Sequence, residues 1–340
     1  MAHDHALRLT GLDALDPLAF LASLGCLLAA TEHAETHERP RPKLRFDLGG
    51  RVLPILHSDY PDSDAVVAAL VTDLDTVAGR TESGERDPFL AFTYPDENGV
   101  PVADLKPPVD AFRSFGERLL GLGPSRRSLD WAAATLTDVA LDGSGQAAKP
   151  FALHFTAGQQ RFLAVANELL DGCDSTSRAG SPKRAVDETD IRSALFGPWP
   201  NDRALKVFSW SPAQERSYAL RATDPSSDKK LGTPGADWLA LRGIGLLSSA
   251  PVLSHAREQI ATSGVRGRWK NGTFTYPVWP MPLDVDAVRS LLRHPEVVSS
   301  RKEAPARGVR TLPRGVELLS CRITRSDQGG YGAFSRPSRH

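Results

Sequence analysis

The alternation of apolar and polar positions predicts helices and hairpins that are interspersed along the 340-residue chain. Apolar residues at helical spacing predict helices over residues 18–32, 64–78, 109–120, 129–139, 158–170, 188–196, 234–247 and 283–293. Two-residue alternation predicts strands over residues 6–12, 43–48, 51–56, 89–94, 100–105, 151–155, 205–210, 215–222, 251–253 and 315–324, and a hairpin over residues 264–280. Because hairpins outnumber strand–helix–strand units, we expect an α+β fold of mixed antiparallel sheets with interspersed helices and no doubly wound parallel sheet.

Residues 232–247, with the sequence GTPGADWLALRGIGLL, predict a helix around which the rest of the chain is organised. Thr233 is a suitable N-cap. Gly243 and Gly245 each cost about 1 kcal/mol inside a helix relative to alanine. Their presence indicates either a close approach by another backbone or an early end of the helix. The pattern leaves open whether this is a buried core helix or whether its glycine-rich start and Arg242 form a binding surface.

The chain divides by composition into two parts. Residues 1–172 predict an N-terminal α+β part, and residues 188–340 predict a C-terminal α+β part that carries a basic hairpin and tail. Residues 173–187 are rich in Ser, Gly, Lys and Arg, a composition typical of a flexible loop or linker.

Cysteine usage and hydropathy indicate the compartment. Cys26, Cys173 and Cys321 lie far apart, give no metal-ligand spacing and are odd in number, which argues against a disulfide framework and favours a reducing environment. We find no apolar run of the length needed to span a membrane and no basic region of a signal peptide. We therefore expect a cytoplasmic protein without a membrane partner.

The net charge is zero, but the charges are unevenly distributed. Residues 255–340 hold 15 Lys and Arg against 7 Asp and Glu, whereas residues 1–254 hold 26 against 34. Such a basic C-terminal quarter suggests contact with an anion, often a nucleic acid.

Motifs of catalysis are missing from the sequence, which has no GxxxxGK[ST] loop, no strand-linked GxGxxG and no GxSxG elbow. His33 and His37 have the one-turn spacing of a metal pair but no third ligand nearby, and a solvated helix end explains them better. Residues 57–59, His-Ser-Asp, contain triad residue types without triad geometry, and His154 is interpreted as structural. We predict no catalytic residue, no metal and no cofactor; a nuclease with an unrecognised site is one alternative.

The most informative segment is the predicted hairpin at residues 265–279. Its basic residues Arg266, Arg268 and Lys270 share one strand parity and therefore project from one face, with Trp269 on the other. Asn271 and the following glycine predict the turn. A basic ribbon with aromatic neighbours can hold a nucleic-acid backbone or enter a groove. An ordinary hairpin with one solvated face and one core face predicts the same alternation.

Aromatic residues follow across the predicted turn, namely Phe274, Tyr276 and Trp279. The candidate nucleic-acid-binding residues are Arg266, Arg268, Trp269, Lys270 and Asn271 in the hairpin, Lys229 and Lys230 in a preceding loop, and Arg178, Lys183 and Arg184 in the flexible loop.

Three segments of the chain carry a resemblance to a known family. The first is LTGLDALDPLAFLASLGCLL at residues 9–28, where a strand leads into a helix that begins at a proline. The second is RSYALR at residues 216–221 followed by GADWLALR at residues 235–242. A third is LHFTAGQQRFL at residues 153–163. Together these segments resemble the large-subunit proteins of type I CRISPR effector complexes, most closely those of the I-U/I-G subtypes.

The resemblance implies a non-enzymatic subunit at the foot of a crRNA-guided surveillance complex (Cascade). Such a subunit helps to hold the crRNA 5′ end, recognises the short motif (PAM) in the duplex beside the target, and lets a helicase-nuclease be recruited on target binding. The implied partners are crRNA, target double-stranded DNA, and the backbone and crRNA-end-binding subunits. An adaptor that contacts only other subunits is the further alternative. No family residue is carried over, so the candidate residues rest on the basic hairpin and loops.

Overall fold

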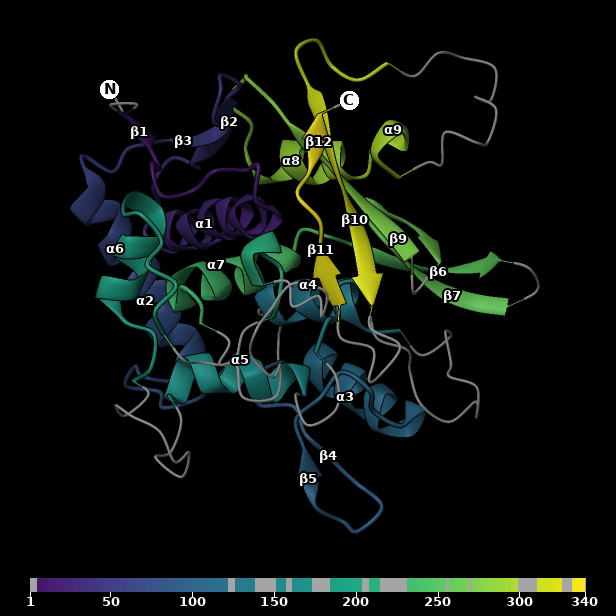
Figure 1. The fold of residues 1–340 in the computed structure, drawn as a ribbon. Helices are drawn as coiled ribbons and strands as arrows, with labels where there is room; N and C mark the ends of the chain where they lie inside the picture. The colour runs from purple at the N-terminus through teal and green to yellow at the C-terminus, as the bar shows by residue number, and fades with distance from the viewer. Residues whose placement is uncertain are drawn as a thin grey trace.

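Helices and antiparallel sheets are interspersed along the chain (Figure 1), which confirms the predicted α+β class. The computed structural model describes residues 5–121, 126–137, 151–156, 161–172, 184–203, 208–214, 231–254, 257–268, 271–298, 311–325 and 332–339. The helices are α1 (Pro17–Thr36), α2 (Ser63–Ala78), α3 (Val109–Gly121), α4 (Arg126–Thr135), α5 (Phe162–Asp171), α6 (Glu188–Phe196), α7 (Pro234–Ile244), α8 (Val285–Leu292) and α9 (Pro295–Val298), with a 3-10 turn η1 at Pro212–Gln214.

The strands pair as antiparallel neighbours. The first sheet has the order β1-β3-β2, formed by β1 (His5–Arg8), β2 (Lys43–Asp47) and β3 (Leu53–Ser58). Two separate ribbons are formed by β4 (Tyr94–Pro95) with β5 (Pro101–Val102) and by β6 (Ser249–Ser254) with β7 (Arg257–Thr262). The largest sheet has the order β11-β10-β9-β8, formed by β8 (Val265–Arg268), β9 (Asn271–Val278), β10 (Glu317–Arg325) and β11 (Gly332–Phe334), with β12 (Ser338–Arg339) also pairing with β10.

Several predicted strands are absent from the described residues. Residues 89–91 form turns instead of a strand, and residues 151–156 and 208–210 form no strand. Residues 215–222 lie outside the described part. Phe89, for example, is fully buried on an irregular backbone. The apolar alternation predicts a strand there, but such alternation only indicates which side chains are buried. In this fold, helices bury these side chains.

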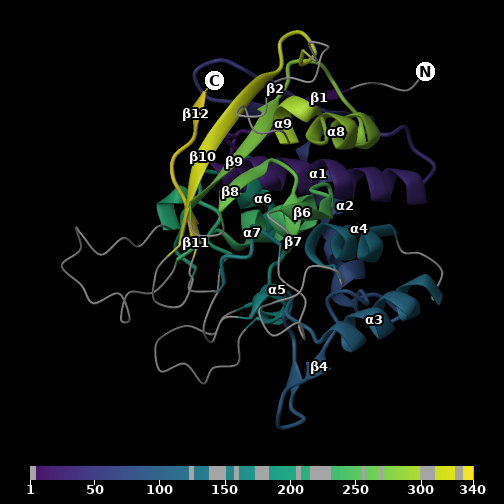
Figure 2. The same ribbon diagram turned by 90° about the vertical axis from the view of Figure 1, so that its right-hand side faces the viewer.

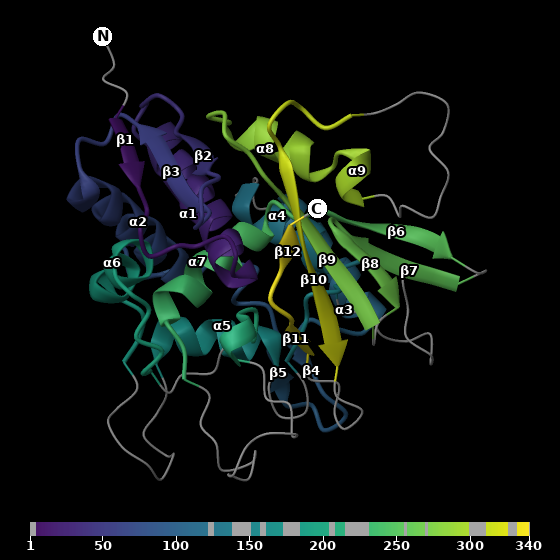
Figure 3. The same cartoon turned by 45° about the horizontal axis from the view of Figure 1, so that its top comes forward.

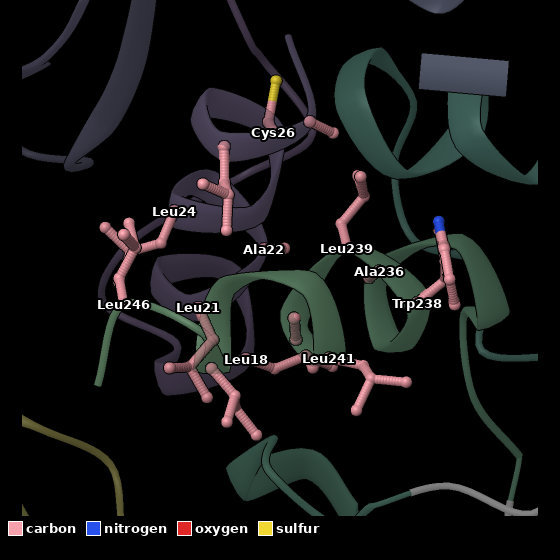
Figure 4. Packing of buried hydrophobic residues seen from close by; sticks show 14 of the residues in the cluster. Leu18, Leu21, Ala22, Leu24, Cys26, Ala236, Trp238, Leu239, Leu241 and Leu246 are labelled. Atoms are coloured by element: carbon pink, nitrogen blue, oxygen red, sulfur yellow. The ribbon is translucent and has the colours of Figure 1, made fainter. Parts of the chain in front are cut away.

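The centre of the fold is the contact between α1 and α7 (Figure 4). A Cβ atom on Gly25 of α1 would lie 1.7 Å from the carbonyl oxygen of Leu239, and one on Gly243 of α7 would lie 2.0 Å from that of Leu21. The two backbones therefore touch where the sequence has glycine, as the helix pattern predicted. Gly245 is the C-cap of α7, so the second glycine marks the end of the helix.

Helix α1 is longer than predicted and corrects the expectation about membrane-length segments. It has 20 residues and is long and apolar enough to cross a membrane, but 89% of its apolar window is buried inside the protein. Asp16 begins the helix by accepting a hydrogen bond of 2.9 Å from the Leu18 amide. Because neighbouring elements cover α1 on nearly all sides, it serves as the core helix of this fold.

The two parts of the chain share one hydrophobic core. The buried apolar residues of the described segments form a single cluster that includes α1 from the first part and α7 from the second. Leu44 of β2 also exchanges backbone hydrogen bonds of 2.8 and 2.9 Å with Leu283 ahead of α8. Within the predicted linker, residues 173–183 lie outside the described part. Cys26 and Cys321 are buried free thiols.

Candidate nucleic-acid interface

The sheet formed by β8, β9 and β10 has an apolar face and a polar face. On β9, Phe274, Tyr276 and Val278 are fully buried. The ring of Tyr276 stacks on Phe20 of α1 with centroids 4.3 Å apart, and its hydroxyl donates a hydrogen bond of 2.8 Å to the Ala14 carbonyl. Figure 2 shows α1 on one side of this sheet. The alternate positions of β9 face the other way.

A row of polar residues crosses the three strands on that other face. Thr273 of β9 lies opposite Arg266 of β8 and Arg322 of β10 in the antiparallel register. Directly opposed residues of antiparallel strands project to the same side, so the row places an arginine on each side of a threonine. The next row pairs Arg268 with Asn271. We call this surface the polar sheet face, defined by Arg266, Asn271, Thr273 and Arg322.

The prediction that Asn271 and the following glycine form the hairpin turn is wrong. Asn271 and Gly272 belong to β9, where they pair with Arg268 and Gly267, so they do not form the turn. Gly267 has a φ of 91°, which glycine adopts without strain. The pairing is set by burial of β9 against the core, which a local Asn-Gly signal does not include.

The aromatic residues that follow the hairpin belong to the core and not to the polar sheet face. Phe274, Tyr276 and Trp279 are all fully buried. The Trp279 indole donates a hydrogen bond of 2.7 Å to the Leu44 carbonyl and so joins the two sheets. The prediction of aromatic neighbours beside the basic residues is therefore wrong for these three side chains.

Arg266 is partly buried and holds the short helix α9 against β8. Its Nη2 donates hydrogen bonds of 2.7 Å to the Glu296 carbonyl and 2.8 Å to the Val297 carbonyl. The last carbonyls of a helix have no partner within the helix. This geometry gives Arg266 a structural role, and its predicted phosphate contact stays a prediction.

Arg322 is the residue of the polar sheet face that sequence reasoning missed. Arg314, Arg322 and Arg336 are exposed and make no ion pair among the described residues. Some exposed arginines of the N-terminal part do find carboxylates, as Arg8 does with Asp47 at 2.8 Å. The positive charge of Arg322 is thus not neutralised by an ion pair within the described part of the chain. The signal was a predicted strand over residues 315–324, but its pairing with the hairpin was not visible in the sequence.

Arg184 is engaged at the start of α6. It forms ion pairs with Asp187 and, at 3.0 Å, with Asp190, whose carboxylate also binds Arg203 at 2.7 Å. These contacts support the capping box of the helix. The other predicted site residues lie outside the described part, so their assignment stays a prediction: Arg178, Lys183, Lys229, Lys230, Trp269 and Lys270.

Arg242 does not reach a surface. It is fully buried, and its Nε and Nη2 donate hydrogen bonds of 2.8 and 2.9 Å to Asp73, with Glu32 at 3.0 Å. Burial by itself would lower the pKa of the guanidinium, but Asp73 and Glu32 outweigh it and raise that pKa well above its usual value. A Cβ on Gly235 would lie 2.2 Å from the Asp190 carbonyl oxygen. The stretch at residues 232–247 is therefore core, and the binding-surface alternative is wrong for Arg242.

The histidine pair on α1 is arranged as part of a packed helix end. The rings of His33 and His37 stack with centroids 4.1 Å apart, and His33 Nδ1 lies 2.8 Å from the Tyr60 hydroxyl. Burial, followed by the nearby His37 and Arg39, lowers the pKa of His33. Among the residues that the structure describes, no group of three or more possible metal ligands occurs.

His154 and His57 also have polar partners. His154 is buried with Nε2 3.4 Å from the Asp104 carboxylate. Burial lowers the pKa of His154 although Asp104 acts in the opposite direction, so the ring is neutral at pH 7. Asp104 also accepts a hydrogen bond of 2.8 Å from the Phe162 amide. His57 Nε2 accepts a hydrogen bond of 3.0 Å from Arg45 Nε.

Comparison with known proteins assigns no family, because no protein-family model matches the chain and no curated protein is significantly similar to it. The geometry of the polar sheet face and the residues of the sequence therefore carry the functional conclusion.

Proposed function

We propose that this chain is a non-catalytic, nucleic-acid-binding subunit of a crRNA-guided type I CRISPR surveillance complex in the cytoplasm. In this role it holds the crRNA 5′ end, recognises the PAM-side duplex of the target DNA, or does both. The polar sheet face contacts the sugar–phosphate backbone. The neighbouring subunits are the backbone and crRNA-end-binding proteins, and a helicase-nuclease joins on target binding.

The observation that carries the proposal is the exposed Arg322 of β10, which lies opposite Thr273 of β9 on the polar sheet face. Arginine and hydroxyl side chains are the usual donors to phosphate oxygens. Adjacent strands lie about 4.8 Å apart, so Arg322 and Thr273 start close together on one surface. Arg322 makes no ion pair among the described residues, so its charge is available to an anion.

Two of the segments that resemble large subunits, residues 9–28 and 235–242, lie at the centre of the fold. Residues 9–28 lead from the end of β1 through most of α1, and residues 235–242 form most of α7, the helix that packs on it. The resemblance therefore concerns the central helix pair, α1 and α7. This supports a shared architecture, while the binding role rests on the sheet.

The test separates binding residues from structural ones. Arg268, Lys270 and Arg322 are changed to alanine together, and Arg266 is left in place because it holds α9. Binding of a fluorescein-labelled DNA duplex and of crRNA is measured by anisotropy at several salt concentrations, with the full chain and with the complex copurified from its operon. For the duplex, removal of each phosphate interaction is expected to reduce the slope of log K against log salt by about 0.9.

The control is Arg192→Ala on α6, which removes one positive charge at the opposite end of the molecule from the polar sheet face (Figure 1). It is expected to leave affinity and slope unchanged. The proposal is overturned if the triple variant binds both probes as the wild type does, or if the complex purified from the operon carries no RNA of defined length. A chain that contacts only other subunits gives the first of these results.

A further inference from the structure

We infer that the β4–β5 hairpin is a docking element for another protein subunit, which receives the tip of the hairpin in an apolar recess bordered by lysine or arginine. The tip is defined by residues 95–101. This attachment point does not depend on nucleic-acid binding by the polar sheet face, and it therefore goes beyond the proposed function. Its partner is identified by the shape, the exposed apolar surface and the charge of the hairpin.

The hairpin projects from the body of the molecule. In Figures 1, 2 and 3 it lies on the far side of α5 from α8 and α9. Its two strands form only two residue pairs, and residues 97–101 of the tip are all exposed. These residues add nothing to the hydrophobic core, and a two-stranded ribbon of this length has little stability of its own. Packing within the described part of the chain therefore does not account for the tip.

The base of the hairpin is fixed to the core. Val102 at the end of β5 is buried. Just ahead of β4, the ring of Phe92 stacks on Phe115 of α3 with centroids 4.2 Å apart. Just after β5, the Ala103 carbonyl accepts a hydrogen bond of 3.0 Å from the Ala164 amide of α5. Because both ends of the ribbon are held in this way, the hairpin leaves the body in a fixed direction.

The tip of the hairpin is held in one conformation by Asp96. Its Oδ1 accepts hydrogen bonds of 2.8 Å from the Asn98 amide and 2.9 Å from the Val100 amide. The Asp96 amide donates to the Val100 carbonyl, and the Asp96 carbonyl accepts from the Gly99 amide, both at 2.9 Å. Gly99 has a φ of 78°, which glycine adopts without strain. A tip that is ordered before it binds loses little conformational entropy on binding, which suits it to recognition.

Two prolines limit how another chain can contact the hairpin. Pro95 and Pro101 lie opposite each other in the last pair before the tip. Proline has no backbone N–H, so neither residue can donate a hydrogen bond to an added strand. Extension of the ribbon by a strand of another chain is therefore disfavoured. The contact surface consists of the side chains of the tip.

The tip combines an exposed apolar side chain with negative charge. Val100 is 54% exposed. Glu97 is exposed and makes no ion pair with a described residue. Residues 94–102 contain Asp96 and Glu97 but no Lys, Arg or His, so this end of the molecule repels phosphate groups. A projecting tip of this kind is complementary to a concave protein surface with an apolar floor and a cationic rim.

The first experiment uses photo-crosslinking in the complex copurified from its operon. The photoreactive amino acid p-benzoylphenylalanine replaces Asn98 in the exposed tip, or Thr72 at an exposed position of α2 as the control. Irradiation is expected to join position 98 to one other polypeptide of the complex, seen as a product of defined mass. Position 72 is expected to give no product with that polypeptide.

The second experiment tests the chemistry of the contact. Glu97→Lys reverses the charge of the tip, and Val100→Asp removes its apolar side chain. Each change is expected to reduce about tenfold the amount of the crosslinked subunit that stays bound to this chain. Glu82→Lys changes an exposed glutamate in another turn and is expected to leave the amount unchanged. Urea denaturation of each variant is expected to give the wild-type free energy of unfolding, because all three positions are exposed.

The outcomes distinguish the docking element from the proposed function. A crosslink from position 98 only to nucleic acid, only to a second copy of this chain, or to no other molecule overturns the inference. So does a crosslinked subunit whose amount is unchanged in both Glu97→Lys and Val100→Asp. The proposed function stands in each of these cases, because the polar sheet face is not altered. If the complex carries no RNA and binds no duplex while the tip still joins another subunit, the proposed function fails and the docking element stands.

Discussion

Gly25 of α1 lies directly against the backbone of Leu239 in α7, at a distance where a Cβ atom would sit 1.7 Å from the Leu239 carbonyl oxygen. Gly243 makes the reciprocal approach to Leu21, with a Cβ position 2.0 Å from its carbonyl oxygen. A pair of glycines facing opposite helices thus brings two backbones into contact. Arg242, the neighbour of Gly243 on α7, is fully buried.

Gly25→Ala is expected to lower the free energy of unfolding by about 3 kcal/mol, because the new methyl group overlaps backbone atoms that cannot move as a side chain does. Gly116→Ala on α3 is the matched control, since a Cβ there meets nothing within 4 Å. The control is expected to raise the free energy of unfolding by about 0.5–1 kcal/mol through helix propensity. Urea denaturation measures both, and equal effects of the two changes would show that the glycine contact is not a constraint.

Arg242→Leu is expected to lower the free energy of unfolding by about 3–5 kcal/mol. The change leaves the Asp73 carboxylate, itself only 6% exposed, without its bidentate partner. Arg8→Ala removes an exposed pair with Asp47 and is expected to cost about 1 kcal/mol or less. Chemical denaturation at neutral pH tests the contrast, which disappears if the buried network contributes no more than the surface pair.

Asp16 gives the fold a pH-dependent contribution. Burial raises the pKa of its carboxyl group to about 6, although hydrogen bonds from Ser211 and the Leu18 amide act against the rise. The folded state therefore binds this proton more tightly than the unfolded state does. The contribution to stability is fully present below about pH 4 and is lost as the pH rises to about 6.

Asp16→Asn removes this titration and keeps an acceptor for the Leu18 amide. Relative to the wild type, the variant is expected to gain stability between about pH 4 and pH 7, by up to about 3 kcal/mol for a shift of about two pKa units. The free energy of unfolding of both proteins is measured by urea denaturation at several pH values. A difference between them that is independent of pH would contradict the assignment.

Arg266 and Arg322 lie in one row, but replacing them with alanine is expected to affect different properties, stability for Arg266 and duplex binding for Arg322. Arg266→Ala removes two hydrogen bonds to the carbonyls of α9 and should lower the free energy of unfolding by about 2 kcal/mol. Arg322→Ala should change stability by about 0.5 kcal/mol or less but reduce the salt dependence of duplex binding by about 0.9. Thermal melting and anisotropy on the same samples measure both, and a loss of stability in Arg322→Ala would assign it a structural role instead.

Local signals in the sequence predicted the helices well. The range 188–196 matches α6 because Asp187 and Asp190 form a capping box that fixes its start. The start of α1 is explained by Asp16 and Pro17, which define the first turn without reference to the rest of the chain. The α+β class followed from the order of such elements.

The strands were predicted less well, because the alternation of apolar and polar residues indicates which side chains are buried and not which strands pair. Phe89, Phe151 and Phe155 are buried on backbone that is not in a strand. The return strand β7 was missed because its sequence, REQIAT, is mostly polar. The turn of the basic hairpin was misplaced because the favourable Asn-Gly dipeptide lies inside β9.

The sequence by itself determined which segments form helices, that two glycines in an apolar helix require a close backbone or a helix end, and that positive charge concentrates near the C-terminus. These properties depend on neighbouring residues along the chain. Only the tertiary structure decided that Arg242 is buried with Asp73 and that Arg322 joins Arg266 and Thr273 in one row. Both depend on which distant segments pack together. The cost of burying a charge depends on its ion-pair partner, and the register between strands depends on the strand that pairs. A local sequence pattern identifies neither partner.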